Sequence, residues 1–294
     1  MYLAIDLGGT FIKYGLLNEK GQLLNDGKIP TPKNSYNLLI DAIIGLYNNC
    51  STKIDGLAIS LPGTVDVNEG IVYYGGSLRY LHEKNLKRDI SEKTNIPVSV
   101  ENDAKCAALA EYWNGVTQGH PNNVVLVFGT GVGGGVMVNG NLVRGHNLSA
   151  GEVSFIIDKY DKTPRIFGRS GSASEMVNKI AKEKNLAIND GQGVFEYINN
   201  LDEYAEKIFN EFCINIAVQI INFQYILDPS IIAIGGGISE QPIFKKRIID
   251  HIKLIEEASE FVIRTPKIEV CHYKNKANLV GALYHHLTEY KKQV

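Results

Sequence analysis

Apolar residues fall into short runs and helical stripes that alternate along the chain. The first run, residues 2–5, predicts a strand that ends at a Gly-Gly turn, and residues 11–17 then return to extended backbone. A second turn, at Gly21, leads into another short apolar stretch. The chain therefore begins as a meander of paired strands.

Helical and buried extended patterns alternate between residues 36 and 113. Residues 36–49 carry apolar side chains at spacings of three and four, which predicts a helix. Residues 56–61 and 97–100 are near-continuous apolar runs, which are typical of strands buried on both faces. Residues 104–113 are rich in alanine and predict a second helix.

The second half of the chain repeats this organisation. Residues 123–128 and 136–138 predict two strands on either side of a glycine-rich turn, and Asn139-Gly140 predicts a hairpin into residues 141–143. Residues 201–226 form a long amphipathic pattern, open to one break, that predicts a helix. The other expected elements are a strand over 230–234, a helix over 244–255, a strand over 267–271 and a helix over 277–291.

Strands that alternate with helices predict an α/β fold with helices on both faces of each sheet. A chain of 294 residues suits two domains, and the two similar halves predict two similar domains with a substrate cleft between them. We place the smaller domain at residues 1–104 together with the C-terminal helix at about 280–294, and the larger domain at 105–279. The pattern alone allows the last helix to pack on either domain.

Composition and charge exclude several classes of partner. The net charge is −2 and the charges are interspersed, so we expect neither a nucleic-acid partner nor a membrane-binding face. The four cysteines form no C-x-x-C pair, which argues against a zinc knot or a redox pair. The N-terminus lacks the basic segment of a signal peptide, and no apolar run approaches the roughly 20 residues that span a bilayer. We therefore expect a cytoplasmic protein.

The first candidate motif, Asp-Leu-Gly-Gly-Thr at residues 6–10, follows the first strand. Gly8 and Gly9 let backbone N–H groups approach an anion closely, and Thr10 adds a hydroxyl donor. Asp6 would repel a bare phosphate, so it indicates an intervening Mg²⁺ ion held through water, while Lys13 adds positive charge. The alternative is a simple hairpin turn.

A second glycine-rich segment, residues 129–135, contains five glycines in seven residues between two apolar strands. That composition costs conformational entropy, which a backbone cradle for phosphates would explain. No Gly-Lys-Ser/Thr follows, and the glycines lead into a strand, so neither a P-loop nor a dinucleotide fingerprint fits. The alternative is a glycine-rich bulge.

A third glycine segment, residues 235–237, follows a buried strand, where α/β folds bind ligands. A flat ring system could approach its backbone closely. The alternative is a strand-to-helix turn that needs a positive φ.

Glu101-Asn102-Asp103 lies between a strand and a helix, at the edge of the sheet where ligands bind. Asp103 could take a proton from a sugar hydroxyl, because phosphoryl transfer needs positioning and charge stabilisation more than covalent chemistry. The alternative is a helix cap, since Asn and Asp are good caps. Glu152, after a polar loop, could accept hydrogen bonds from a sugar, or it could be a surface glutamate.

These motifs, together with Pro62-Gly63 and Ala150-Gly151, occur in the order and at the spacing of the ROK family (repressors, open reading frames, kinases). The chain resembles that family from residue 3 to about 285. The resemblance implies two ribonuclease-H-like domains of the actin-like ATPase class, ATP and Mg²⁺ as cofactors, a sugar substrate and a homodimer.

The resemblance also implies a role for each matching residue. Asp103 matches the catalytic base, and the sugar ligands would be Gly63, Asn102, Asp103, Glu152 and Ser174. The residues that match the phosphate and adenosine motifs are Asp6, Gly8, Gly9, Thr10, Lys13, Thr130, Gly131, Gly133, Gly134, Gly235, Gly236 and Gly237.

The chain departs from the family pattern in one region. Phe155 stands where the family has a histidine that binds zinc and sugar, and residues 171–174 replace a cysteine-containing segment, so we expect no zinc. The family's second sugar-binding glutamate maps to Ser174 or to Glu175. A zinc-free branch of β-glucoside kinases and bacterial N-acetylmannosamine kinases looks similar, and residues 74–82 also fit that branch and would line its pocket.

We therefore predict a kinase that phosphorylates a hydroxyl, at C6, of a hexose, an N-acetylhexosamine or a β-glucoside. Two alternatives are a non-catalytic sugar or nucleotide sensor of the same fold and a sugar-independent ATP hydrolase. Many members of the family are repressors, but here the phosphate motif begins at residue 6, which leaves no room for a DNA-binding domain before it.

Overall fold

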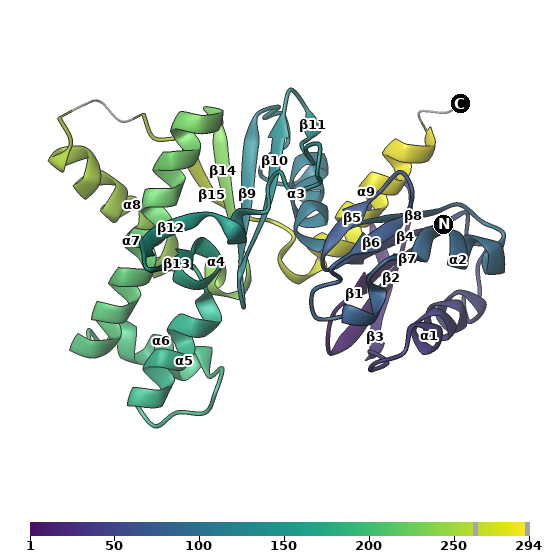
Figure 1. The fold of residues 1–294 in the computed structure, drawn as a ribbon, viewed down its shortest axis with the longest axis horizontal. Helices are drawn as coiled ribbons and strands as arrows, with labels where there is room; N and C mark the ends of the chain where they lie inside the picture. The colour runs from purple at the N-terminus through teal and green to yellow at the C-terminus, as the bar shows by residue number, and fades with distance from the viewer. Residues whose placement is uncertain (261–263, 292–294) are drawn as a thin grey trace. The chain divides into compact units, whose positions relative to one another are not determined.

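The computed structural model describes residues 1–260 and 264–291, and its chain divides into two compact units (Figure 1). Unit 1 contains residues 1–115, the segment Arg144–Ala150 and the chain from Asn275 onward, and unit 2 contains Val116–Val143 and Gly151–Lys274. The expected boundary at 104/105 falls inside helix α3 (Asp103–Asn114), all of which belongs to unit 1. Positions 292–294 of the expected C-terminal segment lie outside the described residues.

Unit 1 is built on a five-stranded sheet with the order β3-β2-β1-β4-β8. β1 pairs antiparallel with β2 and parallel with β4, and β4 pairs parallel with β8. The bounds of these strands are β1 Tyr2–Leu7, β2 Phe11–Leu17, β3 Leu23–Pro30, β4 Gly56–Leu61 and β8 Val98–Asn102. The other elements of the unit are α1 (Tyr36–Asn48), β5 (Thr64–Asp66), β6 (Ile71–Tyr73), η1 (Arg79–Leu81), β7 (Lys84–Asn85), α2 (Leu86–Thr94), α3, η4 (Lys274–Lys276) at its border, and α9 (Ala277–Lys291).

Unit 2 has a five-stranded sheet with the order β11-β10-β9-β14-β15. As in unit 1, the strand β9 pairs antiparallel with the strand that follows it, β10, and parallel with a later strand, β14. The bounds of these strands are β9 Asn123–Phe128, β10 Val132–Val138, β11 Asn141–Leu142, β14 Ile231–Gly235 and β15 Lys267–Val270. The other elements are η2 (Val153–Phe155), β12 (Ile157–Asp161), β13 (Thr163–Ile166), α4 (Phe167–Ser170), α5 (Ala173–Glu183), α6 (Gly191–Asn199), α7 (Glu203–Leu227), η3 (Gly237–Glu240) and α8 (Pro242–Ala258).

The two sheets therefore share one topology, as the repeated sequence pattern predicts. The predicted Asn139-Gly140 hairpin is confirmed, and both residues have the positive φ that a two-residue type I′ turn requires. The long amphipathic pattern is one unbroken helix, α7. The sequence patterns did not predict α2, α5, α6 or the β12–β13 hairpin.

Strand β4 shows why helices cover both faces of the unit 1 sheet. Leu57, Ile59 and Leu61 contribute to the core that includes α1 and α2. On the opposite face, Ala58 packs with Cys106 of α3 and Ala282 of α9. Small residues on that face let two helices pack close to the sheet and to each other.

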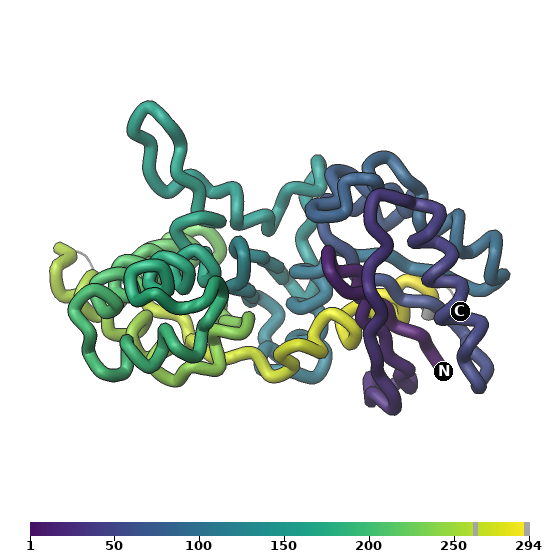
Figure 2. Tube along the Cα trace, turned by 90° about the horizontal axis from the view of Figure 1, so that it is seen from below, coloured from purple at the N-terminus to yellow at the C-terminus, as the bar shows by residue number. Residues whose placement is uncertain are grey.

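Gly281 sets the distance between α9 and α3. A Cβ atom at Gly281 would lie 1.7 Å from the carbonyl oxygen of Cys106, so only glycine fits at this crossing. The helix brings the C-terminal part of the chain beside the first strands (Figure 2). Within the described residues, no helix is long and apolar enough to cross a bilayer.

Helix α9 also buries two consecutive histidines. His286 is 2% exposed, its Nδ1 atom lies 2.9 Å from Ser99 Oγ, and its ring fills the space that a side chain at position 56 would need. Burial, together with His285 and Lys87, lowers the pKa of His286 to about 4. Burial also lowers the pKa of His285. Both imidazoles are therefore neutral in the folded protein at pH 7.

We expect the free energy of unfolding to fall as the pH drops from about 6.5 toward 4, because the unfolded chain binds protons that folded His286 does not. A pKa difference of about 2.5 corresponds to about 3 kcal/mol. Urea unfolding at pH 7, 6 and 5 measures this loss. The variant His286→Asn should show a shallower decline, whereas His146→Asn, at an exposed histidine, should keep the wild-type slope. Parallel slopes for all three proteins would contradict the assignment.

Candidate functional site

Asp6, near the end of β1, is held by residues that the sheet register brings to it. Its Oδ1 atom accepts hydrogen bonds from Ser60 Oγ (2.9 Å) on the parallel neighbour β4 and from Asn278 Nδ2 (3.0 Å) in α9. Its Oδ2 atom lies 3.8 Å from Nζ of Lys13, the register partner of Asp6 on β2. The carboxylate is therefore fixed on one side by neutral donors and faces a cation on the other.

The turn after Asp6 is held by hydrogen bonds to the residues on either side of it. The N–H of Gly8 donates to the carbonyl of Phe11, and the Gly8 carbonyl accepts a hydrogen bond of 2.6 Å from Thr31 Oγ1. A Cβ atom on Gly9 would lie 2.8 Å from Ser77 Oγ. Gly9 and Thr10 are exposed, so their N–H groups and the Thr10 hydroxyl lie at the surface of unit 1.

Asn102 forms the corner between β8 and α3. Its Oδ1 atom accepts the backbone N–H of Lys105 (3.0 Å), which caps the helix, and its Nδ2 donates to the Gly63 carbonyl (2.9 Å) and to Asp103 Oδ1 (3.1 Å). The alternative that this segment caps a helix is therefore confirmed for Asn102. Asp103 is the first residue of that helix, α3.

Glu101 is a buried residue that the sequence patterns noted only as part of a motif. It is 1% exposed, and its Oε1 atom accepts the N–H of Asn102 (2.8 Å). Its Oε2 atom accepts two hydrogen bonds from the guanidinium of Arg144, one of them from Nε at 3.0 Å. A buried carboxylate needs such a partner, and the charge of Glu101 at the end of an apolar strand was the available signal.

In unit 2, the glycine loop is attached to the start of α5. Ser172 caps α5 by accepting the Glu175 N–H (3.0 Å), and its hydroxyl donates to the Thr130 carbonyl (2.8 Å). The backbone N–H of Ser174 donates to the carbonyl of Gly129 (3.1 Å). Ser174 therefore lies beside the loop, whereas Glu175 is exposed and pairs with Arg169.

Two of the predicted glycines are explained by packing inside unit 2. A Cβ atom on Gly134 would lie 2.6 Å from the Gly151 carbonyl and 2.8 Å from the methyl groups of Val153, so the segment that carries Glu152 packs directly on β10. Gly236 has a φ of +92°, and a Cβ atom there would lie 2.1 Å from the Phe128 carbonyl. This is the strand-to-helix turn with positive φ that the sequence left as an alternative. A Cβ atom on Gly237 would meet nothing within 4 Å.

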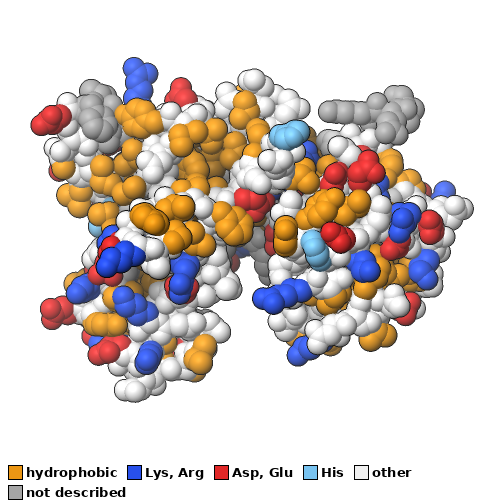
Figure 3. Space-filling model, in the orientation of Figure 1, with side chains coloured by type: hydrophobic (Ala, Val, Ile, Leu, Met, Phe, Trp, Pro, Cys, Tyr) orange, Lys and Arg blue, Asp and Glu red, His pale blue; other side chains and the backbone are white. Residues whose placement is uncertain are grey.

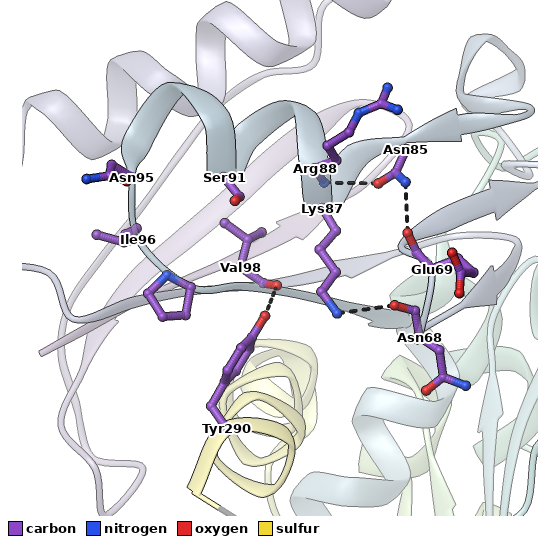
Figure 4. A pocket seen from close by; sticks show the side chains of 11 residues that line it. Asn68, Glu69, Asn85, Lys87, Arg88, Ser91, Asn95, Ile96, Val98 and Tyr290 are labelled. Carbon is purple, nitrogen blue, oxygen red and sulfur yellow. Dashed lines mark hydrogen bonds between the residues drawn. The ribbon is translucent and has the colours of Figure 1, made fainter. Parts of the chain in front are cut away.

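The pocket in Figure 4 is separate from these residues, and none of the predicted site residues lines it. It has a volume of about 570 Å³ and lies in unit 1 near α2 and Tyr290. Its Lys87 is neutralised by Glu289 at 2.5 Å, and its Tyr290 hydroxyl donates to the Val98 carbonyl. Its other cation, Arg88, pairs with Asp89 at 2.8 Å, so both cations that line the pocket are compensated within the protein.

With this geometry in view, the profile of the ROK family matches residues 2–289. The chain belongs to the ROK family. It is 33% identical to a beta-glucoside kinase from Listeria innocua, over 97% of both chains. Both proteins therefore share one architecture over nearly their whole lengths.

Two solved structures support the assignment of the fold. A ROK family protein from Streptococcus pneumoniae TIGR4, in complex with sucrose, has a TM-score of 0.91 and 28% identity and covers 99% of both chains. A ROK family glucokinase from Streptomyces griseus, with glucose and AMPPNP, has a TM-score of 0.79 and 24% identity over 96% of this chain and 97% of that one. The predicted α/β fold of the actin-like ATPase class is thus confirmed.

The region where this ROK chain departs from the family pattern presents apolar side chains to solvent. Phe155 is 70% exposed at the end of η2, and Ile157 and Tyr160 of the following hairpin are 58% and 73% exposed. Hydrophobic side chains gather at several places on the face of the molecule shown in Figure 3. Among the described residues, no group of three or more His, Cys, Asp or Glu side chains could hold a metal ion. The absence of zinc remains a prediction that metal analysis of the purified protein can test.

We expect Arg144→Met to lower the free energy of unfolding by about 3 kcal/mol, because Glu101 would stay buried without its partner. The double variant Arg144→Met/Glu101→Gln should recover part of that loss, since the buried charge is then removed. The control is Arg169→Met, which breaks an exposed ion pair and should cost less than about 1 kcal/mol. Urea unfolding of the four proteins measures these values, and equal small losses for both arginines would contradict the role of the pair.

Proposed function

We propose that this ROK protein transfers the γ-phosphate of ATP to the C6 hydroxyl of the glucosyl unit of a β-glucoside, with Asp103 as the general base. At the coarser level, its relationship to named sugar kinases makes it an ATP-dependent carbohydrate kinase. The proposal concerns the acceptor sugar and the residues that act on it.

The observation that carries the proposal is the Asn102–Asp103 corner of unit 1. Asn102 is 6% exposed, and its side chain forms hydrogen bonds with the first turn of α3, with Gly63 and with Asp103. These bonds hold the backbone that carries the Asp103 carboxylate in one position. A carboxylate held in this way can accept the proton of a sugar hydroxyl as the hydroxyl oxygen attacks the γ-phosphorus. The bond between the γ-phosphorus and the β,γ-bridging oxygen then breaks, and ADP leaves.

Asp6 suits the role of a ligand to Mg²⁺ through water. Its oxygens are hard acceptors, and one of them is already oriented by Ser60 and Asn278. Bound Mg²⁺ would neutralise charge on the β- and γ-phosphates. Lys13, at 3.8 Å from Asp6, would add positive charge on the same side.

We assign the exposed backbone of the two glycine turns to the phosphates and that of the third glycine segment to adenosine. In the first turn the donors are the N–H group of Gly9 and the hydroxyl of Thr10, while Gly8, whose N–H is bonded to Phe11, shapes the turn. In unit 2 the donors belong to the loop at Thr130 and Gly131. The packing of Gly134 on Gly151 and Val153 supports a structural role for this glycine, which orients Glu152. Glu152, with Gly63, Asn102 and Ser174, would bind the sugar.

Two observations support a β-glucoside as the acceptor sugar: the name of one relative and the side chain at position 155. The Listeria innocua relative bears the name beta-glucoside kinase. By the resemblance, Phe155 stands in place of a histidine that contacts the sugar, and its exposed ring would offer an apolar environment to a substituent at C1. A homodimer and a cytoplasmic location remain predictions from the family and the composition.

Asp103→Asn should keep the fold and lower kcat by about 10² or more, because an amide cannot accept the hydroxyl proton. A coupled ADP-release assay with Mg-ATP and cellobiose or glucose measures this loss. Asp161→Asn, at an exposed position of the β12–β13 hairpin, is the control and should keep wild-type turnover. Near-normal turnover of Asp103→Asn would rule out the base assignment. Sugar binding by the wild type without ADP release from any sugar would favour a sensor.

A further inference from the structure

Two aromatic rings of unit 1 form an exposed stack at the ends of residues 74–82, the segment that the resemblance to the zinc-free branch places along the pocket. The ring centroids of Tyr74 and His82 are 5.0 Å apart, with 22° between the ring planes. Tyr74 is 77% exposed, although an exposed tyrosine ring forfeits the stabilisation that burial would give it. The imidazole therefore covers one face of the phenol ring, and much of the remaining surface of Tyr74 is open to solvent.

The backbone holds this stack in place. Tyr74 follows β6 and has a φ of +49°, a left-handed conformation that is uncommon for a bulky residue and that clusters at functional sites. Its N–H donates to His82 Nδ1 at 3.3 Å, so Nδ1 is the acceptor of the ring and the other nitrogen carries the proton in the neutral form. The carbonyl of Tyr74 accepts the N–H of Gly76. Both rings are thus fixed by one short loop.

The loop that carries Tyr74 contacts Gly63, which is bonded to Asn102, the residue before Asp103. Gly63 has a φ of +103°, and a Cβ atom there would lie 2.5 Å from the Tyr74 carbonyl and 2.8 Å from Gly75 Cα. The carbonyl of Gly63 in turn accepts the side-chain hydrogen bond of Asn102. A chain of direct contacts within unit 1 therefore runs from the Tyr74 backbone through Gly63 to Asn102, the neighbour of Asp103.

Another exposed tyrosine lacks this combination. Tyr160 is 73% exposed, but no stacking ring lies against it among the described residues. It lies in unit 2, on the β12–β13 hairpin. The Tyr74–His82 stack is distinguished by its backing ring, its left-handed backbone and its contact with the Gly63 loop.

We propose that the Tyr74–His82 stack is a platform for the aglycone of the substrate, the ring attached to C1 of the phosphorylated glucosyl unit. This inference rests on the proposed function. A sugar ring offers an apolar C–H face to an aromatic ring, and an aryl aglycone offers a second π-system, so either would pack on the open face of Tyr74. The platform makes the chain selective for glycosides over free hexoses, because glucose has no second ring to reach it.

The test compares substrates with and without a second ring. In a coupled ADP-release assay, Tyr74→Ala should raise KM for cellobiose and for phenyl β-glucoside by roughly 5–10-fold and change KM for glucose by less than about 2-fold. Tyr74→Phe keeps the ring and should behave as the wild type. Because position 74 has a positive φ, Tyr74→Gly removes the ring without backbone strain and should reproduce the Tyr74→Ala result.

The control is Tyr160→Ala, which removes an equally exposed ring from unit 2 and should leave all three KM values unchanged. Equal changes for glucose and the glycosides, or no change in Tyr74→Ala and Tyr74→Gly, would overturn the platform while leaving the kinase intact. If the wild type phosphorylates none of the three sugars, the proposed function fails. In that case, calorimetry measures the affinities of the wild type and of Tyr74→Gly for cellobiose and for glucose. The platform is supported only if Tyr74→Gly weakens the binding of cellobiose and not that of glucose.

Discussion

The side chain of Asn102 makes the hydrogen bonds on which the proposed catalytic corner depends. One amide caps α3, holds the Gly63 loop and contacts Asp103, and it can do so because β8 ends and α3 begins at that residue. A buried amide that satisfies both its donor and acceptor capacity is rigid, since every alternative rotamer would leave polar groups without partners. The two hydrogen bonds from the Arg144 guanidinium to Glu101 Oε2 extend this rigidity to the segment Arg144–Ala150, whose neighbours in sequence belong to unit 2.

Close packing on the other face of the same sheet fixes Asp6. Gly56, Ala58 and Gly281 are small enough for α9 to approach both the strands and α3. That approach places Asn278, near the first turn of α9, within 3.0 Å of the Asp6 carboxylate. The orientation of an acid at residue 6 therefore depends on a helix that the chain reaches some 270 residues later, which local sequence patterns cannot reveal.

The parts of the fold that the sequence predicted are those in which burial alone determines the pattern. Residues 56–61 and 123–128 are apolar on both faces, and each is a central strand of its sheet. The β12–β13 hairpin was missed because its strands are mostly exposed and lack the apolar alternation of a half-buried strand.

In the candidate site, too, the sequence patterns indicated some residues and missed others. Asp6 lies near the end of β1, and Asn102 and Asp103 lie where β8 ends and α3 begins, so the strand order brings their neighbours to them. Arg144 was missed because its partner Glu101 is 43 residues away in sequence. The phosphate role of Gly134 stays a prediction. The packing of Gly151 and Val153 by itself requires a residue without a side chain at this position, and a count of glycines cannot distinguish close packing from ligand binding.

The residues proposed for chemistry and those proposed for sugar selectivity differ in how much a substitution would cost in stability. The groups proposed for chemistry sit at the ends of central strands, where a substitution disturbs buried hydrogen bonds and the packing of helices. Tyr74 and Phe155 lie in short connections with little buried area, so their side chains can change at small cost in stability. Selectivity among sugars would then be set by exposed aromatic residues, while the phosphoryl-transfer groups remain constrained by the folding of unit 1.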